Sequence, residues 1–379
     1  MENNVKKVNL AFFILYFADA LVSPFLALFF LEIGITGTKQ GILLALIPLS
    51  NLLGNLLYGK LSFNLKRNLR LSSLLCFIQL IVMSFYGFLT NFGFLIVFTI
   101  IFSLHNSPSF SLTDGIGCKY NDLEHKKYAI TRMFGSLGYL VSVFVGGILI
   151  DFIDYKYVFL IASLLFAFAG IIFFFMEPKE ETVLEKKKIS YKEVLLNKLF
   201  LIYLFSYILV LGAWNIGEAY ISTYLKANGL GVKEWGYCYA GQIVFEVLII
   251  LIGQKIINEN NKNKFLYLSY ILMIIRSFVL FTPLNLITKI LIELPLRGIA
   301  WGIFLSCHMD LVKRLLKVDL VTKGVTALVI VVNIFNTICE YIVPYIFKDL
   351  SYLYLAIAIL QIVGLLLVTR IKFDKACTE

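Results

Sequence analysis

Nine ionisable residues stand inside long apolar stretches of this sequence, where a charged side chain is costly to bury. They are Asp19, Asp114, Arg132, Glu218, Glu246, Arg276, Glu293, Arg297 and Glu340. At mid-membrane such a residue costs about 2.5–3.5 kcal/mol on insertion scales, so it marks either an ion pair or a functional site. Carboxylates in this setting can exchange protons, and guanidinium groups can hydrogen-bond a polar ligand.

Glu246 is the strongest candidate for proton exchange. It lies in VFEVL, and the nearest cation in the sequence is Lys255. A carboxyl group buried without a partner favours its neutral form and can then exchange a proton near neutral pH. We expect Arg276, on the next apolar stretch, to pair with Glu246 when it ionises; a purely structural pair is the alternative. Glu293 and Arg297 are one helical turn apart, so we expect them to neutralise each other.

Asp114 and Arg132 flank a short polar segment, 121–126, and can meet across an antiparallel helix pair. They form either a salt bridge that locks two helices together or a hydrogen-bonding array for the hydroxyl groups of a ligand. A guanidinium suits the second role because its planar fork presents five donors in fixed geometry. Polar and aromatic side chains on other apolar stretches widen the candidate site: Asn51, Asn55, His105, Asn106, Ser107, Trp214 and Asn215.

The composition places these residues in a membrane protein with several spans. Of 379 residues, 60% are hydrophobic and 15% are charged, whereas a soluble domain has about 25% charged residues. Apolar runs of about 20 residues recur along the chain, each long enough to cross the hydrocarbon core as a helix. Because these runs do not alternate in polarity, a β-barrel is excluded. We predict an all-α fold with twelve spans, at about 8–32, 39–60, 69–90, 93–120, 127–150, 156–176, 199–226, 236–257, 264–282, 285–312, 322–347 and 351–371.

Basic residues gather in alternate connections, as the positive-inside rule requires. With both termini in the cytoplasm, the cytoplasmic segments hold 25 Lys and Arg residues, and the external ones hold five. The same asymmetry explains the net charge of +10, so we expect no nucleic-acid partner. The sequence predicts a multi-pass protein of the bacterial cytoplasmic membrane with cytoplasmic termini.

Two pairs of segments repeat at an offset of about 195 residues. FFLEIGITGTKQG (29–41) corresponds to TYLKANGLGVKEWG (223–236), and YGKLSFNLKRN (58–68) corresponds to IGQKIINENNKN (252–263). Parallel repeats of six helices are typical of one transporter architecture. We predict an N-terminal six-helix bundle at 1–176, a cytoplasmic central loop with a short surface helix at 177–198, and a C-terminal six-helix bundle at 199–379.

Two motifs in the first half resemble those of a known family. GKLSFNLKRNLR (59–70) is a glycine-plus-basic loop between the second and third spans, and Asp114 is followed eighteen positions later by Arg132 in RMFGSLGY (132–139). Together they resemble the major facilitator superfamily, and within it the lactose permease and oligosaccharide:proton symporter branch. The resemblance implies that Asp114 and Arg132 form a sugar-recognition pair and that Tyr139 supplies a ring that stacks on the sugar.

In the second half, Glu246 matches the carboxylate that contacts substrate and couples the proton in the resembled branch. Arg276 matches its helix 9 arginine. LPLRGIAWG (294–302) departs from the pattern, because Arg297 stands near the position of a histidine, and Ala300 or Trp301 near that of a glutamate. We therefore expect a proton-coupling group of Glu246, Arg276, Arg297 and Glu293, and we do not expect lactose itself as substrate.

These features predict a secondary active transporter that takes up a small polar solute, sugar-like or nucleoside-like, by alternating access. We expect the proton gradient to supply the energy, no cofactor, and a monomer in the lipid bilayer. No phosphate loop appears, which argues against a primary pump, and no HExxH or nucleophile motif appears, which argues against an enzyme. The six cysteines have no CxxC spacing and indicate neither a disulfide framework nor a metal site. The alternatives are an efflux antiporter for drugs or metabolites, and a transporter-derived sensor without transport.

Overall fold

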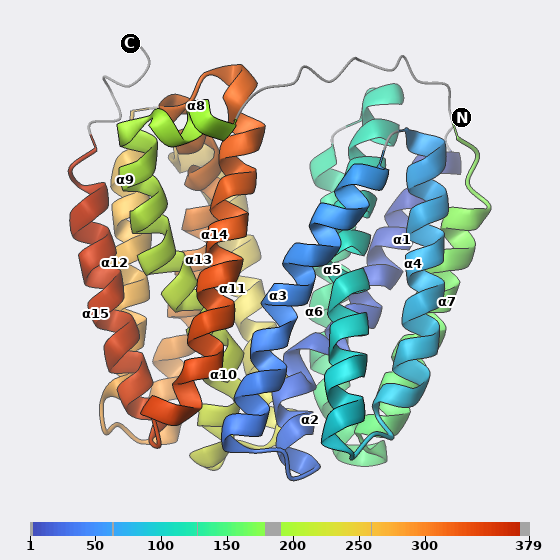
Figure 1. Cartoon of the computed structure of the whole chain (residues 1–379), viewed down its shortest axis with the longest axis horizontal. Coiled ribbons are helices and arrows are strands. Elements are labelled where there is room, and N and C mark those ends of the chain that lie inside the picture. Colours follow the sequence, from blue (N-terminus) through green and yellow to red (C-terminus); the bar gives the residue numbers. More distant parts are fainter. Residues whose placement is uncertain (1–2, 63, 127, 179–190, 259, 372–379) are drawn as a thin grey trace. The chain divides into compact units, whose positions relative to one another are not determined.

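Helices make up almost the whole of the computed structural model, which describes residues 3–62, 64–126, 128–178, 191–258 and 260–371 (Figure 1). Within these ranges no strand occurs, and twelve helical segments are long and apolar enough to cross a membrane, as predicted. The elements are α1 (Asn3–Ala20), η1 (Ser23–Phe25), α2 (Leu26–Glu32), α3 (Gly37–Leu61), α4 (Leu65–Tyr86), α5 (Phe92–Leu123), α6 (Tyr128–Ile153), α7 (Tyr155–Phe174), α8 (Tyr191–Leu196), α9 (Lys198–Tyr207), η2 (Ile208–Gly212), α10 (Ala213–Ala227), α11 (Val232–Ile256), α12 (Lys262–Phe281), α13 (Leu286–Leu315), α14 (Val318–Ile346) and α15 (Leu350–Val368).

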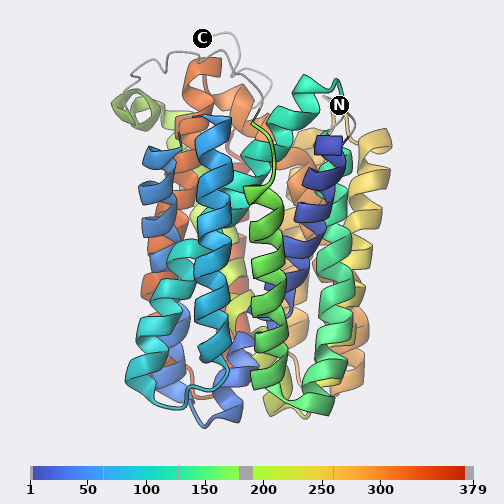
Figure 2. The ribbon, with the colours of Figure 1, turned by 90° about the vertical axis from the view of Figure 1, so that its right-hand side faces the viewer.

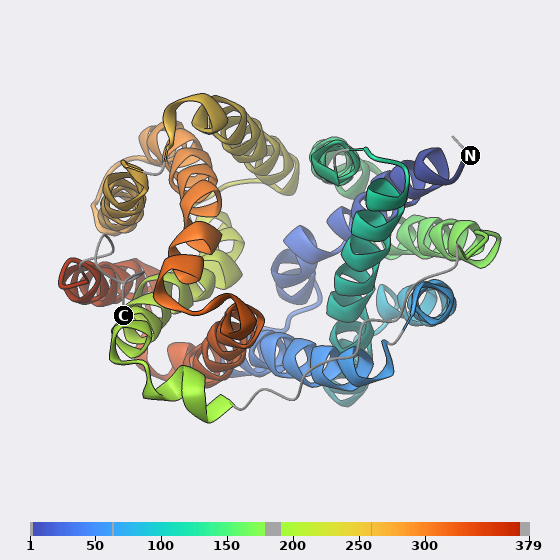
Figure 3. The same cartoon turned by 90° about the horizontal axis from the view of Figure 1, so that it is seen from above.

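The contacts divide the chain into two compact units. The first comprises Met1–Glu185 and Gly231–Ala240, and the second comprises Lys186–Leu230 and Gly241–Glu379. In the first unit α4 packs against α5 and α7, while α1 packs against α6 and α7 (Figure 2). In the second unit α12 packs against α13 and α15, and α15 packs against α9. Figure 3 shows the helices of each unit end-on.

The sequence repeat is also a structural repeat. Gly34 and Gly229 end the first span of each half, and both have positive φ, at +79° and +96°. In each case the next residue donates its backbone N–H to the carbonyl five positions back, at 2.8 and 3.0 Å. This is the Schellman arrangement, in which glycine is favoured because a Cβ would be strained at positive φ. Gly37 and Val232, which begin α3 and α11, are likewise 195 positions apart.

The first span of each half is interrupted, although the sequence predicted continuous helices at 8–32 and 199–226. In the first half α1 ends at Ala20, and the short helix η1 leads into α2. Pro24 contributes to this break because its ring nitrogen has no N–H for the helical hydrogen-bond ladder. In the second half, η2 (Ile208–Gly212) is a π-helical segment between α9 and α10, and such segments are frequent at functional sites.

The predicted central connection, 177–198, is described only in part, because residues 179–190 lie outside the described ranges. At its end, residues 191–196 form the short helix α8, as predicted. Figure 1 shows α8 lying across the ends of α9 and α14, which it contacts.

Candidate functional site

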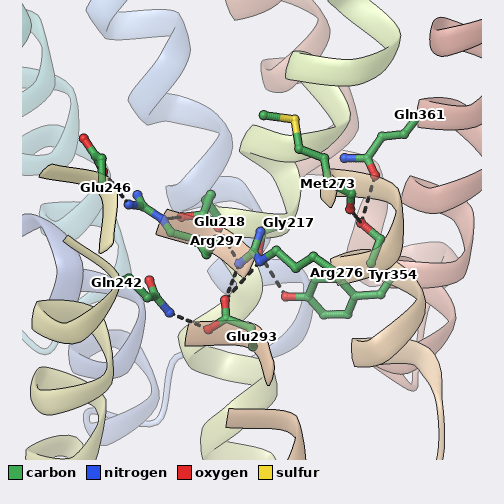
Figure 4. Close-up of polar contacts among 11 residues, drawn as sticks. Gly217, Glu218, Gln242, Glu246, Met273, Arg276, Glu293, Arg297, Tyr354 and Gln361 are labelled. Carbon is green, nitrogen blue, oxygen red and sulfur yellow. Dashed lines mark hydrogen bonds and ion pairs between the residues drawn. The ribbon is translucent and has the colours of Figure 1, made fainter. Parts of the chain in front are cut away.

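Five charged side chains in the second unit form a continuous chain of ion pairs, here called the five-residue ion network (Figure 4). Glu246 on α11 pairs with Arg297 on α13 at 2.8 Å. Arg297 also reaches Glu218 on α10, at 3.3 Å, and Glu218 pairs with Arg276 on α12 at 2.6 Å. Arg276 completes the chain with two contacts to Glu293 on α13, at 2.6 and 3.0 Å. Positive and negative groups therefore alternate across four membrane-spanning helices.

The network has a buried end and a more accessible end. The side chains of Arg276 and Glu293 are each 3% exposed, whereas those of Glu246 and Glu218 are 19% and 20% exposed. Gln242 on α11 adds a hydrogen bond to Glu293 at 2.5 Å. Three carboxylates and two guanidinium groups carry one excess negative charge when all are ionised, so the network can accept one proton and become neutral.

An aromatic platform supports the buried arginine. The guanidinium carbon of Arg276 lies 4.3 Å from the ring centroid of Trp214. The Trp214 ring is stacked on that of Trp301, with centroids 6.1 Å apart and planes at 5°. Cation–π contacts of this kind are strongest where the cation is shielded from water. The predicted site residue Trp214 is thus part of the support for Arg276.

The structure changes two of the predicted pairs. Glu246 is not left without a cation, because Arg297 pairs with it in place of the expected Arg276. Glu293 and Arg297, which were expected to pair with each other, pair with residues of other helices instead. Glu293 pairs with Arg276 on α12, and Arg297 pairs with Glu218 on α10 and Glu246 on α11. The reason is geometric. The helix α12 packs against α13, and α11 approaches α13 at Gly298, so side chains from α10, α11 and α12 reach Glu293 and Arg297 and compete with a residue one turn away.

A close approach of α11 and α13 allows Arg297 to reach Glu246. Gly298 of α13 lies against the backbone of α11, where a Cβ would overlap the carbonyl group of Gln242 and lie 2.9 Å from the backbone nitrogen of Glu246. A side chain at Gly298 would therefore push the two helices apart.

We expect Gly298→Ala to destabilise the protein by about 1–3 kcal/mol, the usual cost of overpacking, and to impair the function of the ion network. Thermal unfolding in detergent measures the first effect. Gly115→Ala is the matched control, because a Cβ at Gly115 meets nothing within 4 Å. Equal melting temperatures for the two variants would contradict the close approach.

In the first unit, Asp114 and Arg132 are brought together through Tyr16 and not by a direct ion pair. The hydroxyl of Tyr128 donates to Asp114 at 2.7 Å, and that of Tyr16 lies 3.5 Å from the same oxygen. The guanidinium of Arg132 lies 4.6 Å from the centroid of the Tyr16 ring. Within the described residues no ion pair joins Asp114 to Arg132, so the first of the two alternatives, a salt bridge that locks the helices together, does not form. Arg132 is exposed and Asp114 half-buried, which leaves both available to a ligand.

The remaining predicted site residues are more scattered. Tyr139 faces Tyr239 with ring centroids 6.2 Å apart, and His105 bonds through Nδ1 to the carbonyl of Ile101 at 2.6 Å. Asn51 is half-buried on α3. Asn215 on α10 lies 3.1 Å from the side-chain amide of Asn336 on α14, beside η2. The contacts described for Tyr139, His105 and Asn215 are therefore made with partners other than Asp114 and Arg132.

From the sequence, Glu218 was counted among the buried ionisable residues but not in the proton-coupling group, and no role was given to Gln242 or Lys289. Lys289 is 4% exposed on α13 and donates to the hydroxyl of Tyr224 and, at 3.1 Å, to the carbonyl of Leu280. A signal for it was present: Lys289, Glu293 and Arg297 recur every four residues, which places them on one helix face. Gln242 and Glu246 have the same spacing on α11.

Comparisons with known proteins agree with this architecture. A model of the MFS_1 like family matches residues 6–336. The uncharacterized transporter YwbF of Bacillus subtilis (strain 168) is 23% identical over 334 residues, which is 87% of this chain and 84% of YwbF.

Solved structures with the same fold include two kinds of transporter. A mutant of the nucleoside transporter NupG superposes with a TM-score of 0.82 at 15% identity, covering 97% of this chain and 99% of NupG. The D-xylose-proton symporter gives a TM-score of 0.76 at 12% identity, covering 98% of each chain. At these identities the likeness shows the fold, and it confirms the predicted architecture of two six-helix repeats. The chain therefore belongs to the MFS_1 like family and is a transporter of the MFS type, not an enzyme.

Proposed function

We propose that this transporter takes up a small polar solute, of the sugar or nucleoside class, together with protons. The observation that carries the proposal is the five-residue ion network. Ionisable residues in membrane-spanning helices are costly and are generally functional, and this network has one carboxylate more than it has guanidinium groups. It can therefore gain and lose one proton while each arginine keeps a carboxylate partner.

Glu246 is the proton-binding carboxylate in this proposal. Its side chain is more exposed than that of Glu293, at 19% against 3%. Protonation of Glu218 would weaken ion pairs to two arginines at once, whereas Glu246 stands at the end of the network. When Glu246 is neutral, Arg297 keeps Glu218 as its counter-ion. Protonation of Glu246 therefore weakens fewer of the network's ion pairs to arginine than protonation of Glu218 does.

One proton per solute is enough energy for uptake. A charge that crosses about 100 mV yields about 2.3 kcal/mol. At about 1.4 kcal/mol per tenfold in concentration, this sustains a gradient of roughly fortyfold. No nucleotide domain or cofactor is needed for accumulation of that size.

The substrate class follows from the first unit. The side chains of Asp114, Arg132, Tyr16 and Tyr128 combine a carboxylate, a guanidinium and aromatic rings, as a polyhydroxylated or ring-bearing solute requires. Within this group, Asp114 and Arg132 resemble the sugar-recognition pair of the lactose permease branch. The names of the structural neighbours, a nucleoside transporter and a xylose–proton symporter, point to the same classes.

Uptake into proteoliposomes tests the proposal. Purified protein is reconstituted and assayed with labelled nucleosides and sugars, with and without an inside-alkaline pH gradient. We expect at least one solute to accumulate inside the proteoliposomes, and we expect this accumulation to be lost when a protonophore is added. Accumulation driven by an opposite gradient would indicate an efflux antiporter, and solute binding without any flux would indicate a sensor.

We expect Asp114→Asn to lower the apparent affinity for the solute at least tenfold while leaving the melting temperature nearly unchanged. Asp114 accepts hydrogen bonds but is not in an ion pair with Arg132, so its loss leaves no buried charge without a partner. Solute-concentration curves in proteoliposomes and thermal unfolding provide the two measurements. A large loss of stability at unchanged affinity would assign Asp114 a structural role instead.

A further inference from the structure

A buried acid in the first unit takes no part in the sites described above. Asp19, near the end of α1, is 6% exposed. Its Oδ1 accepts hydrogen bonds from Ser23 Oγ at 2.6 Å and from Asn106 Nδ2 at 2.7 Å. In the described parts of the chain no Lys, Arg or His pairs with it. A carboxylate buried with hydrogen bonds but without a cation carries an uncompensated charge, which is unfavourable in a membrane interior.

An oxygen atom without a hydrogen-bond donor lies next to Asp19. The helix α1 ends at Ala20, the residue after Asp19, and Pro24 has no N–H to donate to the carbonyl of Ala20. Asn106 Oδ1 is fully buried and has no hydrogen-bond partner. A carboxylate, an amide oxygen, a hydroxyl and a backbone carbonyl are the ligands that hard cations prefer. Broken membrane helices coordinate Na⁺ or H⁺ in this way in other transporters.

The other titratable groups around this part of α1 are engaged elsewhere. Tyr16, one turn before Asp19, directs its hydroxyl towards Asp114 on α5. Arg132 on α6 lies over the Tyr16 ring, and His105 on α5 bonds to a backbone carbonyl. None of them supplies the missing positive charge.

We propose that Asp19, Ser23 and Asn106 form a site for a monovalent cation, H⁺ or Na⁺, distinct from the five-residue ion network. A bound cation neutralises Asp19 and takes up the free oxygen of Asn106. Because Ser23 and Pro24 lie within the break itself, occupancy of the site fixes the geometry of the link between α1 and α2. That this cation is coupled to solute movement rests on the proposed function; its binding does not.

A tryptophan at the break offers a direct reporter. Trp235, in the segment of α11 that belongs to the first unit, donates its indole N–H to the carbonyl of Pro24 at 3.0 Å. The chain has three tryptophans, so the double variant Trp214→Phe/Trp301→Phe keeps Trp235 as the sole tryptophan, which is excited at a wavelength that tyrosine does not absorb. Its fluorescence is followed in detergent during titration with NaCl at constant ionic strength set by choline chloride. A second titration varies pH without sodium.

We expect a saturable change in Trp235 emission in one titration, and this identifies the cation. Asp19→Asn in the same background should abolish it, and Ser23→Ala, which keeps the carboxylate, should weaken apparent affinity at least threefold. Asp151→Asn, an exposed acid on α6, should behave as the parent.

Size-exclusion profiles verify folding, and Ser23→Ala carries the test if Asp19→Asn does not fold. The proposal is overturned if the parent responds to neither cation, or if the Asp19 and Ser23 variants respond as the parent does. A cation response in this background, together with no solute uptake by the protein that keeps all three tryptophans, would leave this site intact and contradict only the transport proposal.

Discussion

Replacing Arg276 by glutamine should destabilise the protein by about 3–5 kcal/mol, the cost of breaking a buried ion pair by removing one partner. Arg276 is 3% exposed and is the shared counter-ion of Glu218 and Glu293. Without it, Glu293 keeps a hydrogen bond from Gln242 but loses its guanidinium contacts. Heating in detergent followed by size-exclusion chromatography measures the loss, which we expect to be accompanied by loss of transport.

A second substitution separates charge balance from coupling. In Arg276→Gln/Glu293→Gln one positive and one negative group are removed together, so most of the lost stability should return while transport stays impaired. Arg370→Gln, at an exposed arginine of the same unit, should melt like the wild type. If Arg276→Gln melted like Arg370→Gln, the pairs in Figure 4 would not contribute to stability.

The fold was predictable because each membrane-spanning helix requires a long apolar segment, which is easy to recognise in the sequence. Each span must be apolar over about 20 residues, and the glycines that end the first span of each half recur at Gly34 and Gly229. The interruptions were less visible. Pro24 signals the break after α1, but the π-helical segment at Ile208–Gly212 occurs in ILVLG, which contains nothing that distinguishes it from an ordinary apolar helix.

The candidate site was predictable as a set of residues but not as a set of pairs. Glu246, Arg276, Glu293 and Arg297 were expected together, and the structure brings them together. Their partners depend on which helices pack side by side and on how closely they approach, as at Gly298. Local spacing favoured a pair within α13, whereas the structure pairs each member with another helix. Asp114 and Arg132 show the same limit, because Tyr16 on α1 stands between them.

The second large effect is expected at the accessible end of the network. Glu246→Gln should abolish accumulation driven by a pH gradient, so that the internal solute only equals the external one, while exchange of solute across the membrane stays within about threefold of the wild type. Glutamine has nearly the shape of protonated glutamate but cannot release a proton, which locks the network in its neutral form. Arg297 retains Glu218 as counter-ion at 3.3 Å, so the fold should survive.

Two assays and two further variants test this prediction. Counterflow in preloaded proteoliposomes reports exchange, and uptake under an inside-alkaline gradient reports coupling. Glu234→Gln, an exposed acid on the same helix, should retain both activities. Glu218→Gln tests the bridging carboxylate, which contacts both arginines: loss of coupling there, with accumulation intact in Glu246→Gln, would move the proton to Glu218. Since Glu246 stands at the end of a chain in which charges alternate, its neutralisation removes one link, whereas neutralising Glu218 divides the network in two.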